Sequence, residues 1–170
     1  MTAMTSRRVL LRNVALLSLL MFAPFAQADH PLWVLIDPAS GDSVFSTDAE
    51  EKKRLVAGHW KVNAEVRIWS EGAADRSELH RLVRVANDRS SRLVSARADE
   101  IATAKRAGFV DEGALGFVAL KELNDSLVPV RRFKNGDRFL WLIDEADRAW
   151  AENSGWQLVG EDFWVMPAGK

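Results

Sequence analysis

The sequence predicts a mainly β domain with one short helix per repeat, in the α+β class, arranged as a pseudo-threefold, β-trefoil-like closed domain of three β-β-α-β(β) units. The first observation is an aromatic anchor that recurs at Trp60, Phe109 and Trp156, 49 and 47 residues apart. The second is that similar residues recur at fixed offsets around each anchor. The third is a shared order of strand, turn, strand and helix before it. Because units this short cannot bury a core alone, three copies are expected to share one.

The matching positions extend without a gap over about 20 residues of each unit. A small residue stands four positions after every anchor, an acid nine before it, and apolar residues five, fifteen and sixteen before it. In order of offset these residues are Ala64, Gly113 and Gly160; Leu55, Ala104 and Ala151; Glu51, Glu100 and Asp147; Phe45, Val94 and Trp141; Val44, Leu93 and Leu140.

Each unit is expected to open with two strands joined by a tight turn. The first strands are LWVLI (32–36), LHRLVRV (79–85) and VPVRRF (128–133), and the second are SVFS, RLVS and RFLWL. Between them lie PASGD, ANDRSS and KNGD, which supply the Gly, Asn, Asp and Pro that turns favour.

A short helix and an extended stretch complete each unit. In the first helix Thr47 and Glu50 are spaced as a capping box. Glycines at 58, 108 and 155 follow the helices, where a positive φ is easily adopted. The last stretches are KVNAEVRIW, VDEGALGFVAL and QLVGEDFWVM, and the small residue in each predicts either a bulge or a break into two strands.

Residues 1–28 have the pattern of an export signal. Arg7, Arg8 and Arg12 precede an apolar run over 14–25, and Ala26-Gln27-Ala28 is a small-x-small cleavage site. A membrane anchor is the alternative, but a span needs about 20 apolar residues. We therefore expect cleavage after Ala28 and a periplasmic or secreted protein. Residues 6–12 also resemble a twin-arginine signal, although the general secretory route is favoured.

Residues 29–170 form one predicted domain with repeats at about 31–70, 79–120 and 127–166. The chain has 23 basic and 24 acidic residues, and residues 1–28 hold three of the arginines and no acid, which leaves a formal charge of −4. That charge argues against a nucleic-acid partner. No later segment is apolar enough to span a membrane. The absence of cysteine excludes disulfides and thiol chemistry.

These residues resemble a family of secreted bacterial and fungal repeat domains of unknown function. Its units carry a strand ending Phe-Tyr-Thr-Thr, a helix beginning near Ala-Glu-Arg, and Gly-Trp followed by Glu-Gly. Here Val44-Phe45-Ser46-Thr47-Asp48, the helix acids, Glu112-Gly113 and Gly155-Trp156 occupy those places over nearly all of the exported chain. The family's tyrosines are absent, Arg97 replaces a capping acid, and Leu142-Ile143 replaces the threonines. The resemblance implies an exported, non-catalytic accessory or binding domain.

Catalytic and metal chemistry are not indicated by the residue pattern. His30, His59 and His80 lack metal-ligand spacing, and no serine has a nucleophile-elbow context. Glu51, Glu100 and Asp147 could line a threefold axis and bind a cation. The favoured interpretation is structural, because an acid in the first turn of a helix stabilises the helix dipole and can pair with arginine. We expect no enzyme activity, cofactor or metal.

Two tryptophans are candidate binding platforms. Trp150 aligns with the polar residues Arg54 and Thr103, and Trp33 aligns with Arg81 and Arg131, so both are expected to be exposed. Four other tryptophans align with apolar residues and are expected in the core: Trp60, Trp141, Trp156 and Trp164. Exposed aromatic rings stack on sugars or contact partner proteins. The sequence therefore predicts an exported, non-catalytic module that binds carbohydrate or cell-wall glycan; the alternative is an envelope protein-interaction or inhibitor domain.

Overall fold

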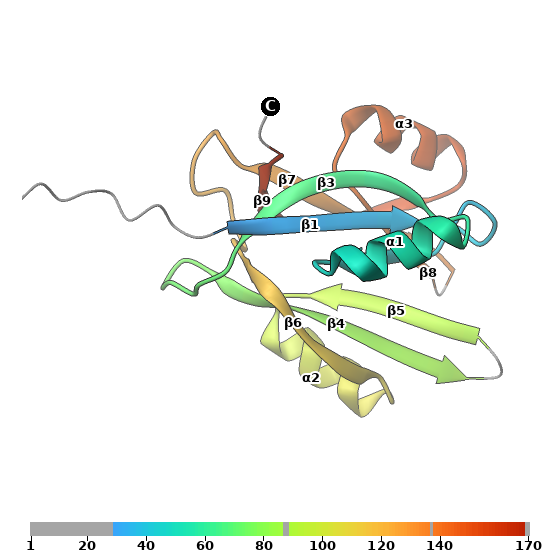
Figure 1. Ribbon diagram of the computed structural model, residues 1–170, viewed down its shortest axis with the longest axis horizontal. Coiled ribbons are helices and arrows are strands. Elements are labelled where there is room, and N and C mark those ends of the chain that lie inside the picture. The colour runs from blue at the N-terminus through green and yellow to red at the C-terminus, as the bar shows by residue number, and fades with distance from the viewer. Residues whose placement is uncertain (1–28, 87–88, 137, 169–170) are drawn as a thin grey trace, which may run out of the picture.

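The computed structural model describes residues 29–168 except 87–88 and 137, so the predicted export signal lies outside the described residues. The order strand, strand, helix, strand occurs three times in this part of the chain (Figure 1). Unit 1 comprises β1 (Asp29–Ile36), β2 (Ser43–Ser46), α1 (Ala49–Ala57) and β3 (Lys61–Trp69). Unit 2 comprises β4 (Ser77–Ala86), β5 (Arg89–Ser95), α2 (Ala98–Arg106) and β6 (Val110–Val118). Unit 3 comprises β7 (Val128–Asn135), β8 (Arg138–Leu142), α3 (Glu145–Asn153) and β9 (Gln157–Pro167).

The strands form an open antiparallel sheet. Within each unit the first strand is central and pairs with the other two. The third strands join the units, because β3 pairs with both β6 and β9. The resulting order is β5-β4-β6-β3-β9-β7-β8, with β1 and β2 branching from β3. The predicted mainly β class is confirmed. The hydrogen-bonded order of the described strands does not close into a barrel, in contrast to the expected closed arrangement.

The last stretch of each unit is one bulged strand, so of the two predicted outcomes the bulge is confirmed and the break into two strands is wrong. Pairing between β1 and β3 shifts after Val34, which faces Ala64. Shifts also follow Arg81, which faces Gly113, and Arg132, which faces Gly160. A small residue at the shift allows the strand to bend without losing its partner.

The helices begin and end with local devices that differ from one unit to the next. Asp48 caps α1 by accepting from the amides of Glu50 and Glu51, so the expected cap by Thr47 is wrong. The carboxylate can reach two orphan amides at the helix start. After α1 the positive φ falls on His59 (φ 76°) and not on the preceding glycine, while Gly108 and Gly155 have positive φ after α2 and α3.

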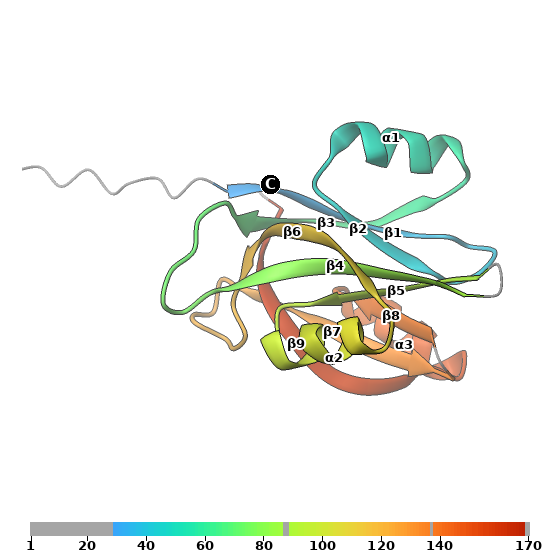
Figure 2. The ribbon, with the colours of Figure 1, turned by 90° about the horizontal axis from the view of Figure 1, so that it is seen from below.

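The core lies between the strands, and the helices cover the outside. Trp141, Phe45, Phe163 and Leu32 are fully buried, and the rings of Phe45 and Trp141 meet edge to face with centroids 5.7 Å apart. α1 buries no residue, and the three helices project from the outer side of the strands (Figures 1 and 2). None of the helices in the described ranges is long and apolar enough to cross a membrane.

Candidate functional site

The junction between units 1 and 2 is closed by a serine, a glutamate and an arginine. The Ser46 hydroxyl donates to Glu51 over 2.5 Å. Arg81, from the first strand of unit 2, donates to the same carboxylate over 2.7 Å and to the Phe45 carbonyl over 3.0 Å. Arg81 also pairs with Glu112 at 2.8 Å. Arg81 thus links α1 of unit 1 to β4 and β6 of unit 2.

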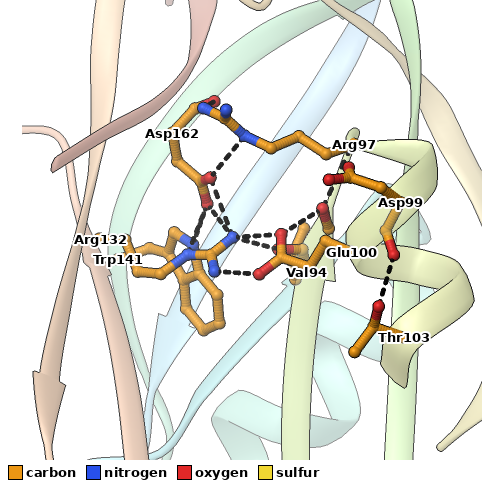
Figure 3. A network of polar contacts seen from close by, with 9 residues as sticks. Val94, Arg97, Asp99, Glu100, Thr103, Arg132, Trp141 and Asp162 are labelled. Atoms are coloured by element: carbon orange, nitrogen blue, oxygen red, sulfur yellow. Dashed lines mark hydrogen bonds and ion pairs between the residues drawn. The ribbon is translucent and has the colours of Figure 1, made fainter. Parts of the chain in front are cut away.

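The junction between units 2 and 3 repeats this arrangement (Figure 3). It is more buried, because the Arg132 side chain is 8% exposed and that of Arg81 is 18% exposed. Ser95 donates to Glu100 over 2.5 Å, and Arg132 donates to the same carboxylate over 2.9 Å. Arg132 also donates to Asp162, which accepts from the Trp141 indole over 2.8 Å. Every hydrogen-bonding group at the centre of this network has a protein partner, which favours a structural role.

The charges at both junctions are stabilised by their partners. Burial opposes ionisation of Glu51 and Glu100, but the arginine and serine hydrogen bonds outweigh it and lower the pKa of both carboxyls. For Arg81 and Arg132, burial likewise favours the neutral form, yet the glutamate partners raise the pKa of both guanidinium groups. These groups therefore stay ionised and paired.

The junction between units 3 and 1 has different residues at the same pairing positions. Val34 faces Phe45 as Arg81 faces Val94 and Arg132 faces Trp141. Leu142 stands five residues before Asp147, where Ser46 and Ser95 precede Glu51 and Glu100. Both the arginine and the serine are thus replaced by apolar residues. Asp147 forms no ion pair with any residue that the structure describes.

A cavity of about 450 Å³ lies at this third junction. Its walls come from the end of β1 and the following turn, the start of β3, the end of β8, and α3. Trp150 and Asp147 are three residues apart on α3, which places them on one helix face. Trp150 is 54% exposed. The remaining lining residues are Ile36, Asp37, Pro38, Gly41, Lys61, Val62, Asn63 and Leu142.

The cavity combines an apolar wall with charged and amide groups. Val62 and Leu142 are apolar, while Lys61 and Asn63 offer hydrogen-bond donors. Asp37 is partly engaged, because its carboxylate accepts from the Ala39 amide and the Ser40 hydroxyl. Those hydrogen bonds, led by the one from Ala39, lower the pKa of Asp37 and keep it ionised. An exposed indole beside convergent polar groups is suited to binding a small ligand.

The structure treats the two candidate tryptophans differently. Trp150 is exposed and lines the cavity, whereas Trp33 is only 8% exposed, so its predicted exposure is wrong. The register changes one counterpart: Trp33 faces Ser46 as His80 faces Ser95 and Arg131 faces Leu142, so the residue matched in unit 2 is His80 and not Arg81. Both counterparts are polar, yet their side chains are only 21% and 18% exposed. Polar residues at this strand position are therefore largely covered, and their polarity did not indicate exposure.

Trp33 is held by its own polar contacts in the packed structure. Its indole nitrogen donates to Glu65 over 2.8 Å, and the Lys52 ammonium lies 4.3 Å from the ring centroid. The hydrogen bond and this cation–π contact hold the Trp33 side chain in place through residues of unit 1 alone.

The recurring acids do not form a common cation site in the described ranges. Those ranges contain no group of three or more His, Asp or Glu side chains arranged to hold a metal. Glu51 and Glu100 lie in the two arginine networks, and Asp147 lies at the third junction. The cavity-lining residues Lys61, Val62, Asn63 and Leu142 were not predicted from the sequence. The change from serine to leucine five residues before the acid was the one available signal.

Comparison with known proteins places the chain in a family without identifying its activity. Residues 19–119 match the family described as "Domain of unknown function (DUF5648)". No curated protein and no solved structure matches the chain. The match ends before α3, so Asp147 and Trp150 lie beyond it. Because the matched range is more than half of the chain, the protein belongs to the DUF5648 family.

Proposed function

We propose that this protein is an exported, non-catalytic module that binds carbohydrate, with a cell-wall glycan as the ligand class. The binding site is the cavity at the third junction, which is lined by Asp147 and Trp150 of α3 and is called the α3 cavity below. The observation that carries the proposal is the position of Trp150. The residue is 54% exposed and lines a cavity that is also lined by Asp147 and Asn63. An indole face packs against the apolar CH face of a sugar ring, while carboxylate and amide groups bind its hydroxyls.

The dimensions and charge of the cavity fit a short stretch of glycan. A volume of about 450 Å³ lies within the range of small-molecule sites. Asp147 is free to accept hydrogen bonds because Val34 replaces the arginine that occupies its counterparts. Lys61 supplies a donor on the β3 side.

The proposal includes export through the signal in residues 1–28, with cleavage after Ala28 and a periplasmic or secreted location. Its support is the arginine-rich start, the short apolar run and the Ala-Gln-Ala exit. The intact mass of the exported protein would test the cleavage site directly.

The proposal also includes three repeats around an approximate threefold axis, closed in the manner of a β-trefoil. Two sets of contacts support it: β2, β5 and β8 contact one another, and so do β3, β6 and β9. The matched pairings of Ala64, Gly113 and Gly160 at the strand bulges also support it. Divergence of one junction would then explain its different lining: the cavity between units 2 and 3 is lined by the paired charges Glu100, Arg132 and Asp162, whereas the α3 cavity has Leu142 and an unpaired Asp147 among the described residues.

The binding test is calorimetric titration with soluble oligosaccharides and peptidoglycan fragments, repeated with Trp150→Ala and Trp150→Phe. We expect saturable binding that weakens about tenfold or more in Trp150→Ala, equivalent to about 1.4 kcal/mol. Trp150→Phe should retain most of the affinity because it keeps an aromatic face. Calorimetry is preferred to tryptophan fluorescence as the binding assay, because Trp150→Ala would also remove the fluorophore that reports binding.

A matched control removes exposed apolar surface elsewhere. Val110 is 65% exposed at the start of β6, and Val110→Ala should leave glycan binding unchanged. Absence of saturable binding by the unaltered protein with every glycan would overturn the proposal. Equal weakening by Val110→Ala would show that the loss is not specific to the cavity.

A protein-interaction or inhibitor role is the second candidate. Val62 is 40% exposed and lines the same cavity as Trp150, so the apolar surface extends beyond one aromatic ring. If no glycan binds, the test is whether the protein captures an envelope protein. Capture that is lost in both Trp150→Ala and Val62→Asp would favour this candidate.

A further inference from the structure

A second cavity, of about 370 Å³, lies where the ends of the three β-hairpins meet. The ends of β1, β4 and β7 all lie on the side of the molecule away from the start of β1 (Figures 1 and 2). No residue lines both this cavity and the α3 cavity. The lining residues are Asp42, Ser43, Arg84, Ser90, Ser91, Arg92, Phe109, Lys134, Gly136, Arg138 and Phe139.

The lining of this hairpin cavity is strongly basic. Among the described lining residues, four side chains are cationic, Arg84, Arg92, Lys134 and Arg138, and one is a carboxylate, Asp42. None of the four forms an ion pair with a carboxylate in the described ranges, in contrast to the arginines of the unit junctions. Like charges gathered around a hollow repel one another unless an anion lies between them. The cavity therefore has the electrostatic character of an anion site.

Three of these cations are held by the anchor aromatics. The guanidinium carbon of Arg84 lies 5.0 Å from the Phe109 ring centroid, and that of Arg92 lies 5.7 Å from the centroid of Trp60. Arg138 lies 5.4 Å from the centroid of Trp156. Stacking on an aromatic face restricts a guanidinium while leaving its N–H groups able to donate. The arginines are thus positioned before a ligand arrives.

Two polar atoms of the lining residues have no hydrogen-bond partner. Ser43 is 3% exposed, and its buried hydroxyl oxygen has no partner among the described residues. The buried Nε of Arg84 also has none. Buried polar groups are almost always satisfied, because an unmet group costs about 1–3 kcal/mol. Both atoms can donate a hydrogen bond, which is what an oxyanion requires.

We infer that the hairpin cavity binds a phosphate group, either as free phosphate or as a small phosphate monoester. The four cations and one carboxylate among the described lining residues suit a ligand with two negative charges better than a ligand with one. Arginine forks and a serine hydroxyl are the usual partners of tetrahedral phosphate oxygens. This site does not depend on glycan binding at Trp150, because the two cavities share no residue.

The experiment is calorimetric titration of the purified protein with inorganic phosphate and, separately, with glycerol phosphate, at constant ionic strength set with chloride. We expect saturable binding in at least one arm. Tighter binding of inorganic phosphate identifies the free ion as the ligand, and tighter binding of glycerol phosphate identifies a monoester. No saturable heat in either arm overturns the inference.

Arg92→Gln is the main variant, and Arg54→Gln is its control. Arg54 is exposed on α1 and does not line the cavity, so its replacement removes the same charge from the surface. We expect Arg92→Gln to weaken phosphate binding about tenfold or more, and Arg54→Gln to change it less than about twofold. Equal weakening by both variants would mean general charge attraction and would overturn the site.

Ser43→Ala distinguishes a phosphate-binding serine from a purely structural one, because melting temperature and phosphate affinity should change differently. Without phosphate, removal of the unpartnered hydroxyl should leave the melting temperature unchanged or raised. With phosphate, the same variant should bind more weakly than the unaltered protein. A lowered melting temperature together with unchanged phosphate affinity would count against the site.

Discussion

Arg132 and Asp162 form the most buried ion pair among the described residues, with side chains 8% and 7% exposed. The guanidinium donates to the carboxylate through Nε over 2.8 Å and through Nη2 over 2.7 Å. The same guanidinium is bonded to Glu100 (Figure 3). Two carboxylates from α2 and β9 thus depend on one cation from β7.

Replacement of Arg132 by alanine should be strongly destabilising. It leaves Glu100 and Asp162 without their main partner, and breaking a buried pair costs about 3–5 kcal/mol. Urea denaturation measures the free energy of unfolding. Arg148→Ala is the control, because Arg148 pairs with Glu145 and Glu152 on the surface of α3, where such pairs contribute about 0–1 kcal/mol. Similar losses in both variants would contradict the structural role of the network.

The recurring helix acids should respond differently to neutralisation. Glu51→Gln weakens bonds to Arg81 and Ser46 and should cost about 1.5–3 kcal/mol of unfolding free energy. Asp147→Asn loses only its contribution to the α3 dipole, about 0.3–1 kcal/mol. Asp147→Asn should instead weaken glycan binding. Chemical denaturation and calorimetry on the same samples separate these effects, and equal destabilisation by both changes would contradict the assignment.

Acid should remove part of the stability through Asp111. Burial raises its pKa, but hydrogen bonds from Lys105, His80 and the Gly113 amide prevail and lower the pKa to about 2 from an ordinary 3.8. Because the folded-state pKa is the lower one, the ionised form stabilises the protein above about pH 4, and this stability is lost as the pH falls toward 2. Glu51 and Glu100, whose pKa values are also lowered, act in the same direction.

The acid effect can be measured by following the melting temperature between neutral pH and pH 2. Asp111→Asn should lose about 1 kcal/mol at neutral pH, since half-exposed Lys105 is screened by solvent, and should show a shallower acid slope. Asp125→Asn, in an exposed loop, is the control and should keep the original slope. An unchanged slope in Asp111→Asn would show that other carboxyls account for the acid response.

Two glycines with similar backbone angles should differ in their tolerance of alanine. Gly116 and Gly160 have φ of 144° and 152°, a region that costs other residues about 1–3 kcal/mol. A Cβ at Gly116 would also lie 2.8 Å from Ile68 Cδ1 and 2.9 Å from the Trp69 carbonyl oxygen, whereas a Cβ at Gly160 has no neighbour within 4 Å. Gly116→Ala should therefore lose at least about 2 kcal/mol more, measured by urea denaturation. Equal losses would mean that the backbone angle alone decides both.

The sequence by itself determined the order and type of the elements. Alternating apolar residues, turn residues and an acid-rich helix start are local signals, and each predicted strand pair and helix has a counterpart in the structure. The exposure of Trp150 was also predictable, because Arg54 and Thr103 are polar at the matching helix position. Helix positions align without bulges, so counting residues from the anchor was sufficient there.

Only the tertiary structure decided which side chains meet across the units. The hairpins differ in length, since Trp33 and Ser46 face each other across 13 residues and His80 and Ser95 across 15, and this is why the sequence matched Trp33 with Arg81 although the register matches it with His80. Arg81 and Arg132 reach acids about thirty residues earlier in the chain, and no local spacing encodes such contacts. At the third junction Val34 and Leu142 occupy the positions that hold an arginine and a serine at the other two, and Leu142 lines the α3 cavity. These positions could be matched only once the strand pairing was known.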